Sequence, residues 1–371
     1  MRYLLCGGGT GGHINPAVAI AHGIEKADPD AVIEFAGTSR GMETRLVPAE
    51  GYKLNTVDVY GFRRSLSPRN IKALIKAFTS VREAKNIVKN FKPDIVIGTG
   101  GYASWPCVRA ASKMGVKTLI QEQNAFPGVT TKKLSKYADT VCISFDESRP
   151  RFDISVQDKL VLTGNPVKEN PFSREEARQR LGIADDEIYI LSCGGSLGAE
   201  KVNEYCLEAM EIYKDDLKIK QVHSVGKAGW ERFSALAKEK GLDARDGYSI
   251  LEYIYDMPLR QAAADIVISR AGAMTYSELA CLGRAVIFIP SPNVAEDHQY
   301  KNAEVLMNAG AAVVFRESEL DGKKLANCIL ELAHDAQKRT DMANKMRSFG
   351  KPDALDKIIS EVMKLAGRQK V

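Results

Sequence analysis

The feature that most constrains the fold is a pattern of apolar strand, glycine turn and helix that occurs in both halves of the chain. It occurs at residues 2–26 and 93–106, and again at 188–199 and 264–283. Short apolar runs that alternate with helical patterns are typical of parallel α/β sheets. The 371 residues fit two domains of about 150 residues each. We therefore predict two Rossmann-like α/β domains with parallel sheets that face each other across a cleft.

The composition is that of a cytosolic protein with two hydrophobic cores. Hydrophobic residues make up 44% of the chain, and no apolar run reaches the ~18 residues of a membrane span. The apolar start of the chain is too short for a signal peptide. Seven scattered cysteines, an odd number, are expected to be reduced thiols. Neither they nor the five histidines have the spacing of metal ligands. We expect no metal and no cofactor.

The stretch 264–283 has the features of a site for a nucleotide diphosphate. A strand leads through three small residues, 271–273, into a helix that Gly283 ends, and a second strand follows. Small residues let a ligand approach the first helical turn, where unpaired N–H groups and the helix dipole favour a phosphate. One turn later, Glu278 can accept hydrogen bonds from both ribose hydroxyls. The alternative is an ordinary tight turn followed by a solvated glutamate.

The first glycine turn, residues 7–12, satisfies the G-x-G-x-x-G pattern of dinucleotide-binding proteins. That pattern also requires an acid at the end of the second strand, whereas Glu34 lies in mid-strand. A dinucleotide site is therefore not favoured. His13 directly follows the turn, where its side chain would face the carboxyl ends of the strands. It is a candidate catalytic residue, although it could also simply cap the turn, and a helix is expected from 16 to 26.

Polar residues follow two further strands of the first half. Tyr102 comes after the glycine turn of one strand, and the polar run 122–124 ends the next. Because the carboxyl ends of parallel strands meet at one edge, we expect these side chains near His13. The sequence Asp-Pro-Asp at 28–30 follows a helix, and we expect it in a surface turn rather than in a metal-binding D-x-D motif.

Residues 53–92 are strongly basic, with ten Lys or Arg against two acids. Apolar residues recur there at helical spacing, which predicts a basic amphipathic helix over 69–92. Such a helix can pack on a sheet and leave its charges solvated. It can also attach to an anionic membrane surface, where each basic residue contributes about 1 kcal/mol. No interleaved aromatics or known motif support binding of nucleic acid.

Six motifs, taken in order along the chain, resemble those of one enzyme family. They are Gly7-Gly-Gly-Thr-Gly-Gly-His13, Gly100-Gly-Tyr102, Glu122-Gln-Asn124, Gly194-Gly-Ser-Leu-Gly198, residues 269–278 and Asp297-His-Gln-Tyr300. Each glycine loop alone is weak evidence, but the ordered set is highly specific and spans nearly the whole chain. The chain resembles the MurG family, the UDP-N-acetylglucosamine:N-acetylmuramyl-(pentapeptide) pyrophosphoryl-undecaprenol N-acetylglucosaminyltransferases.

The resemblance implies a fold and an organisation into two domains. The fold is the GT-B glycosyltransferase fold, in which the last helix crosses back to the first domain. We expect an N-terminal acceptor and membrane-associating domain over 1–165, on which a C-terminal helix at about 345–371 packs. A C-terminal domain over 166–344 would bind UDP-GlcNAc.

The resemblance also implies an activity in peptidoglycan synthesis, and with it in cell-wall biogenesis, cell shape and cell division. GlcNAc would pass from UDP-GlcNAc to the C4 hydroxyl of the MurNAc-pentapeptide of undecaprenyl-pyrophosphoryl lipid I, with inversion, to form lipid II. A metal-independent peripheral enzyme is expected at the cytoplasmic face of the bacterial cell membrane, which the basic helix would contact. Other cell-wall synthesis enzymes are possible partners, and no nucleic acid is expected.

Individual site residues follow from the matched motifs. His13 is the leading candidate for the general base and Glu122 the second. The backbone at Ile254 would bind the uracil with Lys168 near it, Glu278 would bind the ribose, and Gln299 the GlcNAc hydroxyls. Arg270 is added as a cation that would neutralise the leaving UDP. The remaining predicted substrate-binding residues are Thr10, Gly11, Gly12, Tyr102, Asn124, Ser196, Ala273, Met274, Thr275, Tyr276 and Ser277.

Three departures from the family pattern stand out. Gln121 occupies a position where many relatives have histidine, so that no histidine there can serve as the base. Lys168 stands where arginine is common, and it lacks the planar fork of a guanidinium. Trp105 replaces a small residue beside the expected acceptor entrance. The alternatives to a transferase are an NAD-linked oxidoreductase, a UDP-GlcNAc epimerase of the same fold and an inactive nucleotide-sugar sensor.

Overall fold

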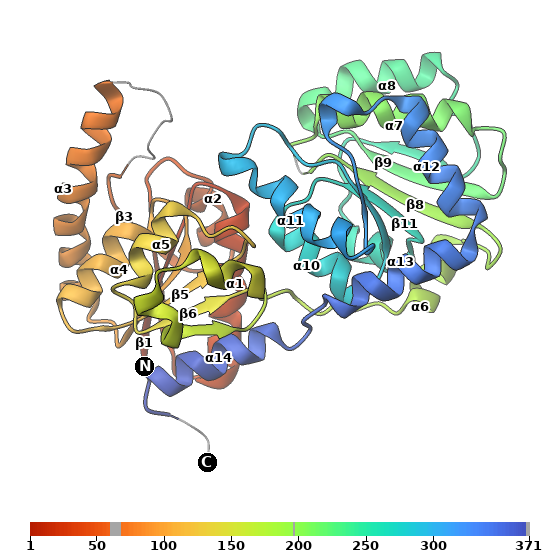
Figure 1. Ribbon diagram of the computed structural model, residues 1–371. Coiled ribbons are helices and arrows are strands. Elements are labelled where there is room, and N and C mark those ends of the chain that lie inside the picture. The colour runs from red at the N-terminus through yellow and green to blue at the C-terminus, as the bar shows by residue number, and fades with distance from the viewer. Residues whose placement is uncertain (60–67, 196, 369–371) are drawn as a thin grey trace. The chain divides into compact units, whose positions relative to one another are not determined.

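The computed structural model describes residues 1–59, 68–195 and 197–368, with the side chains of 68–78 and 295 left aside (Figure 1). The chain divides into two units. Unit 1 consists of Met1–Lys168 and Lys351–Val371, and unit 2 of Glu169–Gly350. The chain thus leaves unit 1 after Lys168 and returns to it with its last helix. Each unit contains its own parallel sheet.

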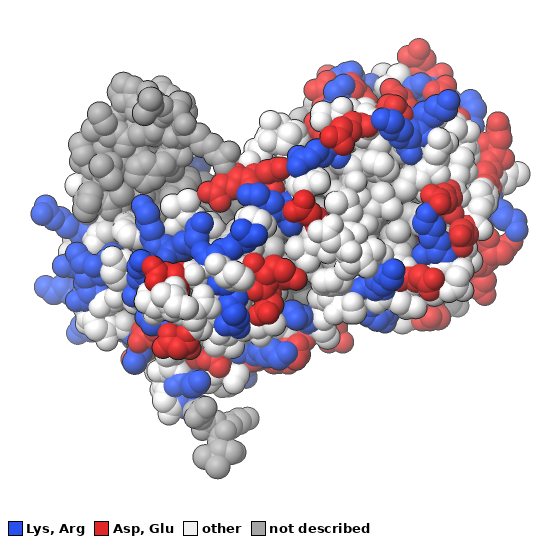
Figure 2. Space-filling model, in the orientation of Figure 1, with Lys and Arg blue, Asp and Glu red and all other residues white. Residues whose placement is uncertain are grey.

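Unit 1 contains a seven-stranded parallel sheet in the order β3-β2-β1-β4-β5-β6-β7. Its strands are β1 (Arg2–Gly7), β2 (Val32–Gly37), β3 (Lys53–Thr56), β4 (Ile95–Gly100), β5 (Lys117–Glu122), β6 (Thr140–Ile143) and β7 (Leu160–Leu162). Its α-helices are α1 (Gly11–Ala27), α2 (Glu43–Ala49), α3 (Pro68–Phe91), α4 (Ser104–Lys113), α5 (Val129–Ser135) and α14 (Ala354–Leu365). Lys and Arg side chains gather along one side of this unit (Figure 2).

The sheet of unit 1 is buried on both faces because successive residues of each strand point to opposite sides. Tyr3 and Leu5 of β1 pack with the apolar side chains of α1 and α14. Leu4 and Cys6 pack on the other face, where the core includes residues of α3, α4 and α5. In α14, Ile358 and Val362 are fully buried. The last helix is therefore an integral part of the core of unit 1.

Unit 2 contains a six-stranded parallel sheet in the order β10-β9-β8-β11-β12-β13. Its strands are β8 (Ile188–Cys193), β9 (Ile219–Ser224), β10 (Tyr248–Leu251), β11 (Ile266–Ser269), β12 (Ala285–Phe288) and β13 (Val313–Val314). Its α-helices are α6 (Arg174–Leu181), α7 (Glu200–Ile212), α8 (Trp230–Glu239), α9 (Met257–Ala263), α10 (Ala273–Leu282), α11 (His298–Asn308), α12 (Gly322–His334) and α13 (Ala336–Ser348). The predicted parallel α/β class is correct for both units.

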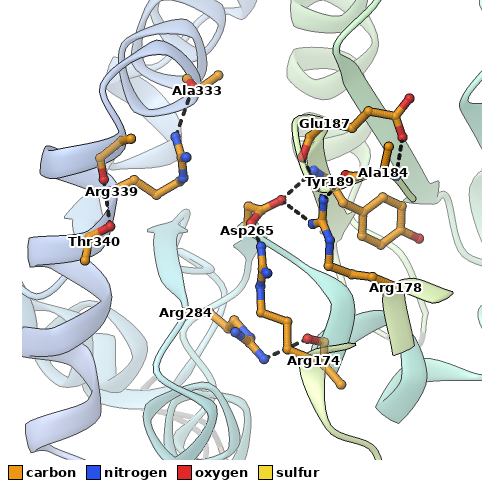
Figure 3. Close-up of polar contacts among 12 residues, drawn as sticks. Arg174, Arg178, Ala184, Glu187, Tyr189, Asp265, Arg284, Ala333, Arg339 and Thr340 are labelled. Carbon is orange, nitrogen blue, oxygen red and sulfur yellow. Dashed lines mark hydrogen bonds and ion pairs between the residues drawn. The ribbon is translucent and has the colours of Figure 1, made fainter. Parts of the chain in front are cut away.

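A buried carboxylate, Asp265, fastens α6 to the amino edge of the unit 2 sheet (Figure 3). It pairs with Arg174 at 2.5 Å and with Arg178 at 2.9 Å, and it accepts the Tyr189 N–H at 2.8 Å. Arg178 is 3% exposed and also donates to two backbone carbonyls. Removal of Asp265 would leave the buried guanidinium of Arg178 without its carboxylate partner, which is strongly destabilising. This cluster lies at the edge opposite the carboxyl ends of the strands and is structural.

One local prediction is wrong. The first helix begins at Gly11 rather than at Pro16, which lies inside it. The ring of a helical proline is directed at the carbonyl four residues earlier, here that of Gly12, and a glycine gives the backbone freedom to adjust. The sequence Asp-Pro-Asp at 28–30 lies in a turn as expected, with Pro29 and Asp30 exposed and the Ala31 N–H donating to the Asp28 carbonyl at 2.9 Å, but the Asp28 side chain is only 3% exposed. It pairs with the amino terminus at 3.0 Å and with Arg368 at 2.9 Å.

Candidate functional site

His13 lies in the first turn of α1, at the carboxyl edge of the unit 1 sheet. Its Nδ1 lies 3.0 Å from Gln123 Oε1 and 3.2 Å from the Thr99 carbonyl oxygen. Both neighbours are acceptors, so Nδ1 carries the proton and the neutral ring presents an unprotonated Nε2. The ring is thereby held in the tautomer that a general base needs.

Gln123 is fixed in the orientation that this tautomer requires. Its Nε2 donates to the Thr99 carbonyl at 2.7 Å and to the Gln121 carbonyl at 3.1 Å, which leaves Oε1 directed at His13. Gln121 is 1% exposed, and its own Nε2 donates to Ser144 Oγ at 3.0 Å and to Asn165 Oδ1 at 3.1 Å. Gln121 therefore belongs to the buried network that supports Gln123.

Glu122, the second candidate base, is directed at its own loop. Its Oε1 accepts the backbone N–H and the side-chain amide of Asn124, both at 3.0 Å, and its Oε2 accepts the Gly128 N–H at 3.1 Å. The residue is 2% exposed. Both oxygens of this carboxylate therefore accept hydrogen bonds from its own loop, at Asn124 and Gly128. The geometry favours His13 as the base and gives Glu122 the task of holding Asn124.

The turn between β1 and α1 carries the predicted Thr10, Gly11 and Gly12. Thr10 is the exposed N-cap of α1, but its side chain makes no capping hydrogen bond. The first N–H groups of the helix are therefore available to an anion. Tyr102 lies against the turn: a Cβ added at Gly9 would lie 3.4 Å from its ring. Burial, and then the nearby carboxylate of Glu43, raise the pKa of Tyr102.

Sequence reasoning missed Glu43, the first residue of α2. Its Oε2 accepts the Gly9 N–H at 3.0 Å, so this carboxylate contacts the same glycine turn from beneath. The signal in the sequence was weak, because Glu43 lies 30 residues after His13 and belongs to no recognised motif. The one hint in the sequence is that two glycines, Gly37 and Gly41, lie close to Glu43, as is expected where little space is left for side chains.

In unit 2, the predicted diphosphate and ribose residues form the start of α10. The N-cap of this helix is Gly272, which has no side chain to cap the helix, and Ser277 Oγ donates back to the Ala273 carbonyl at 2.9 Å. Ala273, Met274 and Thr275 therefore occupy the first turn, where the helix dipole favours an anion. Tyr276 is different, because its side chain is 4% exposed and packs in the core.

Glu278 lies one turn into α10, in a position to bind hydroxyl groups. The contact that the described residues provide for its carboxylate is a long one, from Gln261 Nε2 at 3.5 Å. Burial raises the pKa of Glu278, and the amide of Gln261 opposes that rise only in part. A half-buried carboxylate with so little compensation gains from hydroxyl donors.

Gln299 and Ile254 belong to the same unit as α10. Gln299, the second residue of α11, accepts the Ser291 N–H at 2.9 Å through Oε1, which leaves its Nε2 as a donor for a ligand. Ile254 lies in the loop between β10 and α9, where its side chain is 3% exposed between the exposed Tyr253 and Tyr255. Ser196, in the loop after β8, lies outside the described residues.

Arg270 and Lys168 occupy contrasting environments. Arg270 is paired with Glu317 at 2.5 Å and donates to the carbonyls of Ile289 at 2.9 Å and Pro290 at 3.1 Å. Its charge is thus held in place and largely neutralised within unit 2. Lys168, the last residue of unit 1 before the crossing, is exposed.

Comparison with known proteins adds independent findings. The model of the glycosyltransferase family 28 N-terminal domain matches residues 3–143, and that of the glycosyltransferase family 28 C-terminal domain matches residues 189–358. Together the two matches cover the glycine loops of both units and every predicted site residue except Lys168.

Full-length relatives carry one description. The chain is 41% identical to a protein of Desulforamulus reducens, over 100% of both chains, and 43% identical to one of Acetivibrio thermocellus, over 98% of this chain and 99% of the relative. Both are described as UDP-N-acetylglucosamine--N-acetylmuramyl-(pentapeptide) pyrophosphoryl-undecaprenol N-acetylglucosamine transferase. Among solved structures, Acinetobacter baumannii MurG is similar, with a TM-score of 0.78 and 30% identity over 98% of this chain and 99% of that one.

Proposed function

Because the chain belongs to glycosyltransferase family 28, and within it to the MurG family, we propose that it is an N-acetylglucosaminyltransferase of peptidoglycan synthesis. The donor is UDP-GlcNAc and the acceptor is the C4 hydroxyl of the MurNAc-pentapeptide of undecaprenyl-pyrophosphoryl lipid I. The product is lipid II. The observation that carries the chemical part of this proposal is the tautomer of His13, whose Nδ1 faces two acceptors.

The donor is bound by unit 2 in this proposal. The first turn of α10 binds the diphosphate together with the loop that carries Ser196, and Glu278 accepts hydrogen bonds from the ribose hydroxyls. The backbone at Ile254 binds the uracil, with Lys168 near it, and Gln299 Nε2 donates to a GlcNAc hydroxyl. Arg270 contributes to the field at the leaving UDP as a held and partly neutralised charge, because Glu317 is its ion-pair partner.

The proton is handled by unit 1. Nε2 of His13 removes the proton of the C4 hydroxyl while that oxygen forms a bond to the anomeric carbon of GlcNAc. The bond from that carbon to the diphosphate oxygen breaks, and UDP leaves with the electron pair from the opposite face, which inverts the anomeric configuration. The imidazolium that forms keeps its Nδ1–H on Gln123 and the Thr99 carbonyl, so the ring does not reorient during the reaction.

The test is a transfer assay with defined substrates. The enzyme is incubated with radiolabelled UDP-GlcNAc and a short-chain lipid I analogue, with and without a chelator, and the products are separated and identified by mass spectrometry. The proposal predicts a lipid-linked disaccharide in both samples. UDP-GlcNAc that is consumed or epimerised without any lipid-linked product would contradict it.

We further infer that unit 1 attaches to an anionic membrane surface as a peripheral protein at the cytoplasmic face. The expected contact over 69–92 corresponds to helix α3, but the side chains of 68–78 lie outside those described. Within the described residues, every helix is too short or too polar to cross a bilayer. The inference therefore depends on the surface next to α3, formed by α4, α5 and the 3₁₀ turn Asp146–Arg151.

That surface carries a basic patch, which consists of Arg109, Lys132, Lys133, Lys136 and Arg151. Four of these residues line a cavity of about 620 Å³ together with Trp105, Tyr137, Phe152 and Asp153. The acid Asp153 pairs with Lys136 at 2.7 Å, and the rings of Trp105 and Tyr137 lie edge to face with their centroids 6.4 Å apart. Cations beside aromatic rings suit the headgroup region of an anionic bilayer. This patch belongs to the basic side of unit 1 (Figure 2).

Lys132→Ala/Lys133→Ala should weaken binding to vesicles of anionic phospholipid by roughly tenfold or more, because each lysine contributes about 1 kcal/mol near such a surface. Cosedimentation at low salt measures the effect. The control is Lys238→Ala/Lys323→Ala, which removes two exposed lysines of unit 2 and should not change binding. Two results would rule out the basic patch as the contact. The first is a wild type that binds neutral vesicles as well as anionic ones, and the second is an equal loss of binding in the two double variants.

A further inference from the structure

A fully buried carboxylate, Glu43, takes no part in the proposed mechanism. It begins α2 and is 0% exposed. Its Oε1 accepts the Thr38 N–H at 2.8 Å and the Thr38 hydroxyl at 2.7 Å, and its Oε2 accepts the Gly9 N–H at 3.0 Å. Burial disfavours the charged form, but the hydrogen bonds from Gly9 and Thr38 outweigh it and lower the pKa of Glu43. The side chain is therefore an ionised carboxylate bonded to neutral donors.

The space around this carboxylate is shaped by three glycines from different turns. A Cβ added at Gly8 would lie 2.5 Å from Glu43 Oε1, and one at Gly37 would lie 2.7 Å from Cγ. At Gly41 the added Cβ would lie 2.0 Å from Oε2. Any side chain at these positions would displace the carboxylate. Gly8, Gly37 and Gly41 therefore form a cradle that fits the Glu43 side chain, and they join the turn after β1 to the end of β2 and the start of α2.

The cradle lies directly beneath the turn that leads to His13. Gly9 has a φ of +88°, and its N–H points to Glu43 while the ring of Tyr102 packs on its other side. The next residue, Thr10, is the N-cap of α1, and the His13 N–H donates to its carbonyl at 3.1 Å. A glycine at positive φ has many alternative conformations, so its conformation must be fixed by contacts. Glu43 supplies the polar one.

We propose that Glu43 is a positioning residue, which acts through the Gly9 N–H to hold the turn 7–12 in the conformation that directs the first N–H groups of α1 and Nε2 of His13 at the reacting groups. This inference rests on the proposed function. A carboxylate is required because every group that faces it is a donor. A glutamine in its place would have to direct an N–H at the donors of either Gly9 or Thr38.

The test compares Glu43→Gln with a matched variant of the same unit. Asp139 also accepts a threonine N–H at 2.8 Å and the hydroxyl of the same threonine at 3.0 Å, but at the amino edge of the sheet, near the start of β5. Asp139→Asn therefore makes a similar chemical change away from the glycine turn. Both variants are assayed as the full chain, with kcat at saturating substrates, KM for each substrate and the thermal midpoint.

Glu43→Gln is expected to lower kcat by about tenfold to a hundredfold, the equivalent of one hydrogen bond to a charged group. UDP binding, which depends on unit 2, should stay within about twofold of the wild type, a bound set by the ordinary scatter of unrelated substitutions. Asp139→Asn should keep kcat while its thermal midpoint falls. Wild-type kcat in Glu43→Gln, or a loss of activity in both variants that follows their thermal midpoints, would overturn the inference.

Amide hydrogen exchange of the segment 7–13 provides a readout that does not depend on turnover. Faster exchange there in Glu43→Gln, with unchanged exchange in Asp139→Asn, is the expected result, and unchanged exchange in both would contradict it. If the wild type makes no lipid-linked product, the proposed function fails, whereas the exchange measurement still decides whether Glu43 holds the turn.

Discussion

The two glycine loops of the molecule are supported from beneath in different ways. In unit 1 the ionised carboxylate of Glu43 accepts the Gly9 N–H. In unit 2 the loop after β8 is in close contact with the loop after β9, since a Cβ at Gly198 would lie 2.1 Å from the Val225 carbonyl oxygen. That carbonyl accepts the side-chain amide of Asn203 at 2.9 Å. One support is therefore charged, and the other is neutral.

The neutral support is a chain of hydrogen bonds with a single consistent direction. Because Asn203 donates to Val225, its Oδ1 must accept from His223 Nε2, 3.2 Å away. Nδ1 of His223 is then the acceptor for Ser192 Oγ at 2.9 Å, and Gln221 Nε2 donates to that hydroxyl oxygen at 2.8 Å. His223 is 0% exposed, and burial lowers its pKa to about 4. This series of hydrogen bonds, which runs from Gln221 to the Val225 carbonyl, therefore contains no charged group at neutral pH.

The difference matches the charge that each loop is proposed to meet. A carboxylate beneath the unit 2 loop would repel a nucleotide diphosphate, because charges interact strongly where water is excluded. In unit 1 the proposed chemistry delivers a proton to His13, and a negative charge in the same unit favours the imidazolium that forms. The comparison teaches that the backbone of a glycine loop can be fixed either by a charged group or by a neutral one.

The largest expected effect is on kcat, and it comes from removal of the proposed base in unit 1. His13→Ala should lower kcat by about 10²- to 10⁴-fold, since general-base catalysis contributes that much, while KM for UDP-GlcNAc changes little. Initial rates at saturating acceptor measure both. The control is His22→Ala, which removes a histidine of the same helix that pairs with Glu50 at 3.3 Å and should keep kcat. A raised donor KM with an unchanged kcat would contradict the assignment.

A smaller effect is expected on the unit 2 side. Glu278→Gln should raise KM for UDP-GlcNAc by about tenfold to a hundredfold, because one acceptor for the ribose hydroxyls is replaced by a donor. Its effect on kcat should be smaller than that of His13→Ala. Titration with UDP alone gives the same comparison without turnover, and Glu319→Gln, an exposed acid of the same unit, is the control. Unchanged UDP affinity would place the ribose elsewhere.

The last comparison concerns folding stability, whose pH dependence differs between the two supports. The pKa of His223 falls from 6.5 to about 4 on folding, so the unfolded chain binds more protons and stability is lost as the pH falls from 6.5 towards 4, by up to about 3 kcal/mol. The pKa of Glu43 is also lowered, so its contribution is lost as the pH falls below 4.5, through its folded pKa.

His223→Gln should therefore be less stable than the wild type at pH 7.5 but should lose less of its thermal midpoint between pH 7 and 5. Differential scanning fluorimetry across this range provides the measurement. His334→Gln, at a 65% exposed histidine, should follow the wild-type curve. Parallel curves for the wild type and His223→Gln would show that the buried histidine does not control acid stability.

Much of the fold was predictable because its signals are local. Apolar strands, glycine turns and helix ends predict both parallel sheets. The start of α1 was not predicted correctly, because a proline usually occupies the first turn of a helix, whereas here Pro16 lies inside the helix. The turn at 28–30 was predicted but the burial of the Asp28 side chain was not, because its partners, the amino terminus and Arg368, are distant in sequence.

Site residues were predictable where they belong to a sequence motif. The residues that hold them in place were not predictable, because they are distant in the sequence. The motifs identify His13, Asn124 and Glu278, but they do not identify the residues that hold these side chains and their loops in place. Glu43 and the chain through His223 depend on tertiary packing between separate turns, which no spacing in the sequence reveals. The pairing of Arg270 with Glu317 is similar, since 47 residues separate them.

The central claim is that the base lies in unit 1 and the donor site in unit 2. The most direct measurement is the pH dependence of single-turnover transfer at saturating UDP-GlcNAc, in the wild type, His13→Ala and Glu278→Gln. The account predicts an acidic limb of slope one in the wild type and at the same pH in Glu278→Gln, and no such limb in His13→Ala. A limb that survives in His13→Ala, or that shifts or disappears in Glu278→Gln, would contradict it.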